Sequence, residues 1–167
     1  MTIDVFTGRN MPWSEDLIKS VSRITGPFTV VPIDRRYDNQ LNFKDYSTLF
    51  FELAKKFQHP SIVRSVLPIY AMCQFPPKEG CVVFEYPEIL LHANDVVWIA
   101  QMIWDLSKNV PVVVITHSQV LVNDLGEKVE NGTLSREEVT VFCEGVGCHF
   151  DEGGVLQEPW PYGFFLP

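Results

Sequence analysis

Short apolar segments alternate with amphipathic segments along most of the chain. The apolar segments are rich in valine and isoleucine, which favours β-strands, and the longest of them are apolar at nearly every position. The amphipathic segments repeat their apolar residues every three to four positions, which predicts helices. The predicted strands are residues 3–8, 26–34, 80–86, 110–118 and 137–145, and the predicted helices are residues 14–24, 46–57, 62–75, 94–109 and 118–132.

Local signals support the ends of several helices. Ser14 is a suitable N-cap for the first helix, and Asn94 or Asp95 stands at the start of the fourth. Gly132 is placed to terminate the last helix. Pro68 must lie early in the third helix or kink it, because proline cannot donate a backbone hydrogen bond. The polar stretch between the second strand and the second helix, residues 35–45, is predicted to be a loop.

The alternation of strands and helices predicts an α/β fold with a mainly parallel sheet and helices on both faces. Strands that are apolar at every position are expected where a parallel sheet is covered on two sides. The chain of 167 residues suits one domain and shows no repeat or linker, so residues 1–167 are predicted to form a single domain.

Charge and apolar content narrow the range of functions. A net charge of -8 disfavours nucleic acid as the main ligand, although Arg35 and Arg36 form a local basic pair. The N-terminus lacks the pattern of a signal peptide, and no apolar run approaches the ~20 residues that cross a bilayer. We therefore expect no contact with membranes and a cytoplasmic location.

The cysteines do not form a metal-binding pattern. Cys143, Cys148 and His149 lie close together in the sequence, but no second pair of ligands accompanies them. The paired spacing of a zinc site is absent, and a cytoplasmic chain is expected to keep its cysteines as thiols. The sequence therefore predicts no metal at this cluster.

Polar residues follow two of the buried strands, where chemistry gathers in an open parallel sheet. The strand in "VVFEYPE" ends at Glu85, and Glu88 follows three residues later. The strand in "VVVITHS" ends at Thr116, His117 and Ser118. If the two strands are neighbours, Glu85 and His117 lie close together at one edge of the sheet.

These motifs resemble the second half of ABC-type ATPases of the RecF, OLD and SMC-like kind. That family has an apolar strand that ends in acidic residues followed by proline and glutamate, and then a strand that ends in Thr-His-Ser. "SVLPIYAMCQFPPKEG", "EKVENGTLSREEVTVFCEG" and "GGVLQEPWPYGFF" resemble flanking segments of OLD-like members. The resemblance covers residues 61–167 and implies the core of a P-loop NTPase, in which Mg-ATP is the cofactor.

The resemblance implies roles for individual residues in a magnesium–nucleotide site. Glu85 matches the acid that holds magnesium, usually through water. Glu88 matches the glutamate of the same motif, and His92 weakly matches a histidine that follows it. His117 matches the histidine that senses the γ-phosphate, and Ser118 is one of its flanking residues. A site inherited in this way consists of Glu85, Glu88, His117 and Ser118, and in an active protein Glu85 and His117 would be catalytic.

The sequence departs from the family at the positions that hydrolysis needs. Tyr86 stands where active members often have a catalytic glutamate, and an ordinary tyrosine has a pKa of about 10. The phosphate-binding loop GxxxxGK[ST] is absent from the chain. Ile62 and Arg64 replace the small residues of the family's signature motif, and Trp13 stands where the loop's lysine belongs. No catalytic residue is therefore expected.

Three hypotheses follow from these patterns. In the first, the protein is an inactive ABC-ATPase-like protein that binds another protein, either a second copy or a larger ATPase of the same type. In the second, it binds nucleotide or hydrolyses it slowly through Glu85 and His117, with Mg-ATP as cofactor. In the third, it is an unrelated α/β enzyme that uses Glu85, Glu88 and His117 for acid–base chemistry. The first hypothesis is favoured, because it does not need the phosphate-binding loop and the catalytic residues that the chain lacks. It predicts no bound cofactor.

Overall fold

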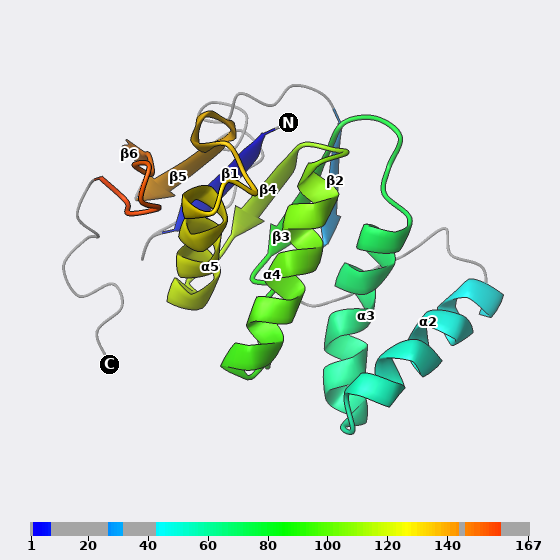
Figure 1. Ribbon diagram of the computed structural model, residues 1–167. Helices are drawn as coiled ribbons and strands as arrows, with labels where there is room; N and C mark the ends of the chain where they lie inside the picture. The colour runs from blue at the N-terminus through cyan, green and yellow to red at the C-terminus, as the bar shows by residue number, and fades with distance from the viewer. Residues whose placement is uncertain (1, 8–26, 32–42, 144–145, 158–167) are drawn as a thin grey trace.

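The computed structural model describes residues 2–7, 27–31, 43–143 and 146–157. Within these residues one sheet has the strand order β2-β3-β4-β1-β5-β6 (Figure 1). The strands are β1 (Ile3–Thr7), β2 (Phe28–Val31), β3 (Cys81–Glu85), β4 (Val112–Ile115), β5 (Val139–Cys143) and β6 (Val146–Cys148).

The sheet is parallel from β2 to β5. Every neighbouring pair in that range is parallel, and only β6 runs antiparallel to its neighbour β5. The prediction of an α/β fold with a mainly parallel sheet is therefore confirmed. Each predicted strand overlaps an observed one, whereas the short strand β6 was not predicted.

The structure describes four α-helices, and the last three of them lie against one face of the sheet. The four are α2 (Phe43–Lys56), α3 (Pro60–Gln74), α4 (Ala93–Ser107) and α5 (Gln119–Glu130), and a short 3-10 helix, η1 (Arg136–Glu138), precedes β5. The parallel strands β1 to β5 run downward in Figure 1, and α3, α4 and α5 begin near the lower edge, where these strands end. We call this the carboxyl edge. The helix α2 lies beyond α3, away from the sheet.

The larger apolar core lies between the sheet and these helices. Alternate residues of the strands, such as Val5, Phe84 and Val114, face the helix layer. Trp104 is buried in this core, and Trp98 is partly buried against it. Burial of these apolar side chains supplies the main stabilisation of the domain.

The opposite face of the sheet carries a second buried cluster. It includes Phe6, Val83, Ile115 and Phe142, and the rings of Phe6 and Phe142 stack with their centroids 4.7 Å apart. None of the described helices lies on this face. The predicted helix 14–24 falls outside the described residues, so helices on both faces stay a prediction.

Two helix boundaries and the place of one proline differ from the sequence-based expectation. The N-cap of α4 is His92, whose Nδ1 accepts a hydrogen bond from the backbone N–H of Asn94 over 3.4 Å, so neither Asn94 nor Asp95 is the cap. The helix α2 begins at Phe43, inside the segment predicted as a loop. Pro68 lies in the middle of α3 and not near its start, and the helix continues through it.

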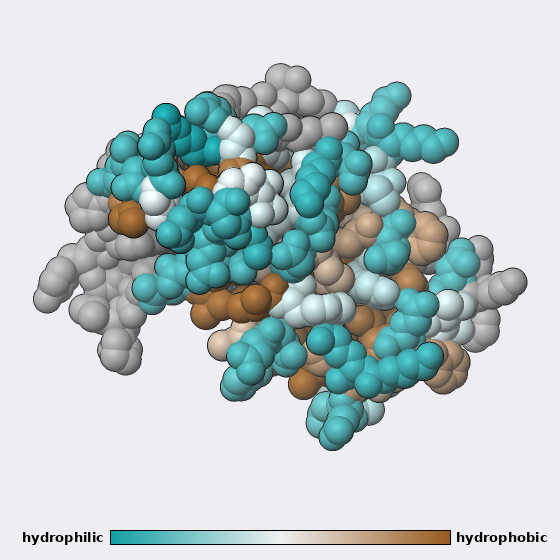
Figure 2. Space-filling model, viewed as in Figure 1, coloured by the Kyte–Doolittle hydropathy of each residue, from teal (hydrophilic) through white to brown (hydrophobic). Residues whose placement is uncertain are grey.

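The outer surface of the helix layer is largely hydrophilic, and brown hydrophobic side chains show between the teal ones (Figure 2). No described helix has the length and apolar character that a membrane span requires. Other features named in the sequence lie outside the described residues: Ser14, the Arg35–Arg36 pair and residues 158–165 of the segment that ends in Phe164 and Phe165.

Candidate functional site at the carboxyl edge

The strand register brings the predicted site residues to one edge. Glu85 is paired in register with Ile115, because β3 and β4 are direct neighbours. The pairing continues one step further, where the Tyr86 N–H donates to the carbonyl of Ile115 over 2.8 Å. Glu85 and His117 therefore leave the sheet side by side, as the sequence predicted.

Tyr86 is the most unusual residue at this edge. Its φ is +45°, in the left-handed region that a bulky side chain rarely adopts, and its exposed fraction is 7%. The Tyr86 hydroxyl lies 3.5 Å from Nε2 of His117, and the two ring centroids are 4.8 Å apart. The backbone conformation thus turns the tyrosine ring onto the histidine ring.

The electrostatic surroundings keep Tyr86 protonated. Burial raises the pKa of the Tyr86 hydroxyl, and the negative charges of Glu88 and Glu85 raise it further. A tyrosine with a raised pKa is a neutral phenol at pH 7, so it does not supply the carboxylate base that the family places at this position.

Glu88 connects the loops that follow β3 and β4. Its Oε1 accepts a hydrogen bond from the backbone N–H of His117 over 2.9 Å. Its Oε2 is buried and has no hydrogen-bond partner among the described residues. Burying a carboxylate oxygen without a partner costs free energy, and a hydrogen-bond donor or a cation placed beside it would offset that cost.

Ser118 has a structural role at this edge. Its Oγ caps α5 by accepting from the N–H of Leu121 over 3.4 Å, and its own N–H donates to Oγ1 of Thr116 over 2.8 Å. The two bonds orient the start of α5 immediately after His117. Ser118 thus lies where the sequence predicted it, and the hydroxyl is engaged by the helix.

Sequence reasoning missed two polar residues on β1. Thr7 ends this strand, is almost fully buried, and its Oγ1 has no hydrogen-bond partner among the described residues. Asp4 is completely buried, and its negative charge adds to the burial that raises the pKa of the Cys81 thiol to about 12. An aspartate inside the apolar run "IDVFT" is the signal that could have revealed Asp4.

The structure places the remaining family positions as follows. Arg64 is exposed near the start of α3, and Ile62 is partly buried against the core. His92, which matched the family weakly, is exposed at the start of α4, where it acts as the cap described above. The residues after β1 that stand in place of a phosphate loop, 8–20, lie outside the described residues.

The cysteine cluster lies on β5 and β6, which β4 and β1 separate from β3 in the sheet. Cys143 and Cys148 are buried on the adjacent strands β5 and β6, and all four cysteines are thiols rather than disulfides. Among the described residues, no group of three or more histidine, cysteine, aspartate or glutamate side chains is arranged to hold a metal ion.

Comparison with known proteins adds no relative: no family model, no curated protein and no solved structure matches the chain. The chemistry of the site is therefore argued from its geometry. Glu85 and Glu88 supply carboxylates, the ligands that magnesium prefers, and His117 supplies an imidazole beside them. Tyr86 lies among these three groups.

Proposed function

We propose that this protein is an ABC-ATPase-like protein that does not hydrolyse nucleotide and that acts by binding another protein. The partner is a second copy of the chain or a larger ATPase of the same type. The proposal rests on the resemblance of residues 61–167 to that family and on the geometry of the carboxyl edge.

The observation that carries the proposal is the contact between Tyr86 and His117. Hydrolysis of a phosphate needs a group that orients or activates water next to the magnesium-binding acid. The residue after Glu85 is here a buried phenol whose hydroxyl lies against the imidazole of His117. The two groups nearest to the expected chemistry therefore engage each other.

The rest of the edge supports use of the domain as a binding scaffold. The sheet keeps its acidic strand end beside the histidine strand end, and the helix layer is well packed. A net charge of -8 disfavours DNA as the partner, because contacts with phosphate supply most non-specific affinity for it. A protein partner fits this charge and this retained shape.

A second candidate function is binding of a magnesium–nucleotide without hydrolysis. Two buried oxygens favour it: Glu88 Oε2 and Thr7 Oγ1 have no hydrogen-bond partners among the described residues, and both residues follow or end strands at the carboxyl edge. A ligand that supplies a cation and a donor would satisfy both groups.

Association in solution tests the first proposal. The molar mass of the purified protein is measured by light scattering over a wide range of concentration, and partners are recovered from its native cell with the tagged chain. A self-associated state, or recovery of a related ATPase, supports the proposal, and a specific interface is expected to bury at least ~1,000 Å². A strictly monomeric protein that recovers no ATPase contradicts it.

A nucleotide titration with magnesium separates the two candidates. If the second is correct, the Glu88→Gln substitution weakens magnesium-dependent binding by roughly tenfold or more, because it neutralises a charge at the site. Glu79→Gln is the matched control, since Glu79 is exposed before the opposite end of β3. Equal binding by both variants excludes a role for Glu88.

A further inference from the structure

Two neighbouring helices begin in the same unusual way. The N-caps of α3 and α4 are His59 and His92, and both residues have an extended backbone. In each case Nδ1 accepts a hydrogen bond from the backbone N–H two residues later, of Ser61 over 3.3 Å and of Asn94 over 3.4 Å. The usual capping residues are serine, threonine, asparagine and aspartate. Histidine in this role at two helix starts adds a property that those residues lack.

That property is the change of charge on the ring. Nδ1 accepts a hydrogen bond only in the neutral imidazole, because both ring nitrogens are donors in the imidazolium. Protonation therefore places an N–H opposite the N–H that the ring capped. It also adds a positive charge at the N-terminus of a helix, where the helix dipole is already positive. Protonation thus disfavours each helix start in two ways.

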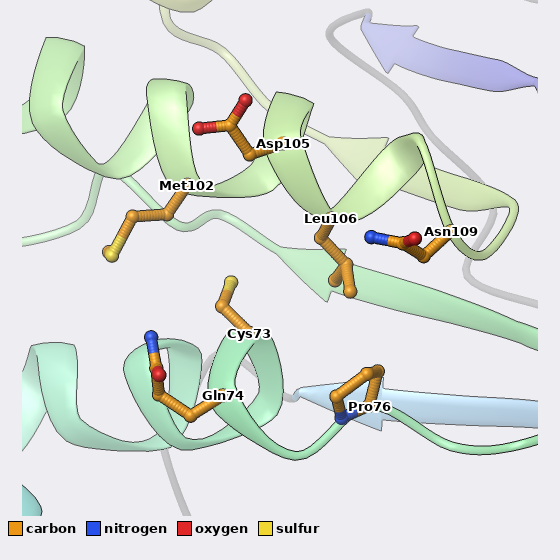
Figure 3. A pocket seen from close by; sticks show the side chains of 7 residues that line it. All are labelled: Cys73, Gln74, Pro76, Met102, Asp105, Leu106 and Asn109. Atoms are coloured by element: carbon orange, nitrogen blue, oxygen red, sulfur yellow. The ribbon is translucent and has the colours of Figure 1, made fainter.

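The two caps stand at the same end of one pair of helices. The helices α3 and α4 pack against each other, and both begin at the carboxyl edge (Figure 1). At their far ends, Cys73 of α3 and Met102 and Leu106 of α4 line one hollow of about 240 Å³ (Figure 3). A change of pH that acts on both caps therefore acts on the end of the pair that lies at the carboxyl edge.

Each cap is linked to the first hydrogen bond inside its helix. The carbonyl of His59 accepts from the N–H of Val63 over 3.2 Å, and the carbonyl of His92 accepts from the N–H of Val96 over 3.0 Å. Both valines are buried, whereas both histidines are exposed. Protons from solvent therefore reach the caps, and the two valine amides report whether the first turn is closed.

The other charged groups beside the caps titrate in different ranges. The described ones on the elements that begin or end at this edge are Lys55 and Lys56 of α2, Arg64 of α3, Glu85, Glu88 and Asp95. The first turn of α5, which packs against α4, has no acidic residue. Groups of these types ordinarily keep their charge between about pH 5 and about pH 7.5, whereas histidine changes it. His117 is a further histidine at this edge, so a test must separate it from the caps.

We propose that His59 and His92 form a pH-sensitive pair of helix caps. With neutral rings, the first turns of α3 and α4 are closed by the two caps. In mild acid the rings are protonated, both caps are lost and the first turns open, so the order of the carboxyl edge depends on pH. This inference does not rest on the proposed function, because it needs neither a nucleotide nor a partner.

Amide hydrogen exchange followed by NMR tests the proposal. The protection factors of Val63 and Val96 are measured at about pH 7.5 and about pH 5, on either side of the range in which histidine ordinarily titrates. Ile103, which is buried in the interior of α4, serves as the internal reference. Loss of a cap typically changes the opening equilibrium about fivefold, so both valines should lose about fivefold more protection in acid than Ile103. A loss no greater than that of Ile103 overturns the proposal.

Two variants serve as controls for each other. Asparagine is a strong N-cap whose side chain does not titrate in this range, so His59→Asn and His92→Asn keep a cap and remove its response to pH. In His59→Asn, Val63 should keep its protection in acid while Val96 still loses it, and His92→Asn should show the reverse. If Val63 loses the same protection in His59→Asn as in the unaltered protein, the cause is a general effect of acid or the titration of another group such as His117. That result contradicts the proposal.

Discussion

The joint between α4, α5 and residues 150–156, where Phe150 and Leu156 form an antiparallel bridge, differs sharply from the carboxyl edge. In the joint, Trp104 Nε1 donates to Oδ2 of the buried Asp124 over 2.7 Å, and Gly126 and Gly154 bring two backbones into close contact. At the carboxyl edge, Tyr86 and Leu90 adopt left-handed conformations, and Glu88 Oε2 has no partner among the described residues.

The contrast suggests that the joint serves the stability of the domain and that the carboxyl edge serves its function. The joint satisfies its buried polar groups and uses glycine where the backbone needs it, as expected of a region selected for stability. The carboxyl edge keeps strained non-glycine residues and an unsatisfied carboxylate oxygen, which are features that gather at functional sites. The predictions below test each side of this comparison.

The largest expected effect is at Gly154 in the joint. Its φ is +69°, and an added Cβ would lie 2.2 Å from the carbonyl oxygen of Gly126. The Gly154→Ala substitution should lower the free energy of unfolding by about 3 kcal/mol, because it combines a left-handed alanine with a clash against backbone. Urea denaturation measures the loss.

Gly132→Ala is the matched control for this prediction. Gly132 has φ +74°, and an added Cβ would meet nothing within 4 Å. This substitution should cost only about 1 kcal/mol, which is the left-handed penalty alone. Similar losses in the two variants would show that the close approach of Gly126 and Gly154 is unimportant.

The next effect is at the buried hydrogen bond of the joint. Trp104→Phe removes the donor to Asp124 and should cost about 2 kcal/mol at pH 7, because a buried carboxylate loses its hydrogen bond and keeps only the ion pair with Lys128 at 3.9 Å. Burial raises the pKa of Asp124, whereas the bond from Trp104 opposes the rise. Removing the bond therefore raises the pKa further.

The sign of the pH dependence follows from that shift. A carboxyl whose pKa is raised on folding favours the folded state below its unfolded pKa, near 3.8, and this contribution is lost as the pH rises through the folded value. The cost of Trp104→Phe should therefore shrink when unfolding is measured in acid, where Asp124 is protonated. A cost that grows in acid would contradict the assigned role of this bond.

The smallest effect is at the carboxyl edge. Leu90 has φ +65° and is 74% exposed, so its side chain contributes little burial. Leu90→Gly should raise the free energy of unfolding by about 0.5 kcal/mol, because relief of the left-handed penalty exceeds the extra chain entropy of glycine. Leu90→Ala keeps the Cβ and should give no gain. A lower free energy of unfolding for Leu90→Gly would show that the backbone at Leu90 is not strained.

The regular elements could be predicted because their signals are local. Runs such as "CVVFE" and "VPVVVI" are too apolar for any place except a buried strand, and the position of Glu85 and His117 at their ends follows from the direction of the strands. The Ser118 cap and Gly132 after α5 follow from ordinary preferences at helix ends.

Other features depend on contacts that the sequence does not display. Histidine is not among the usual N-cap residues, whereas Asn and Asp are, so the sequence favoured Asn94 or Asp95 over His92 as the cap. The strand β6 has three residues and exists because β5 pairs with it. The packing of Tyr86 on His117 depends on a left-handed tyrosine, which tertiary contacts alone impose.

The most direct test of the proposed function is magnesium-dependent ATP turnover by the purified protein and its Glu85→Gln variant. Under the proposed resemblance Glu85 is the residue that would hold magnesium, so every nucleotide-hydrolysing arrangement at this edge would need it. The account predicts that both proteins release phosphate at the same background rate, since Tyr86 provides no base. Robust turnover by the unaltered protein that disappears in Glu85→Gln would contradict it.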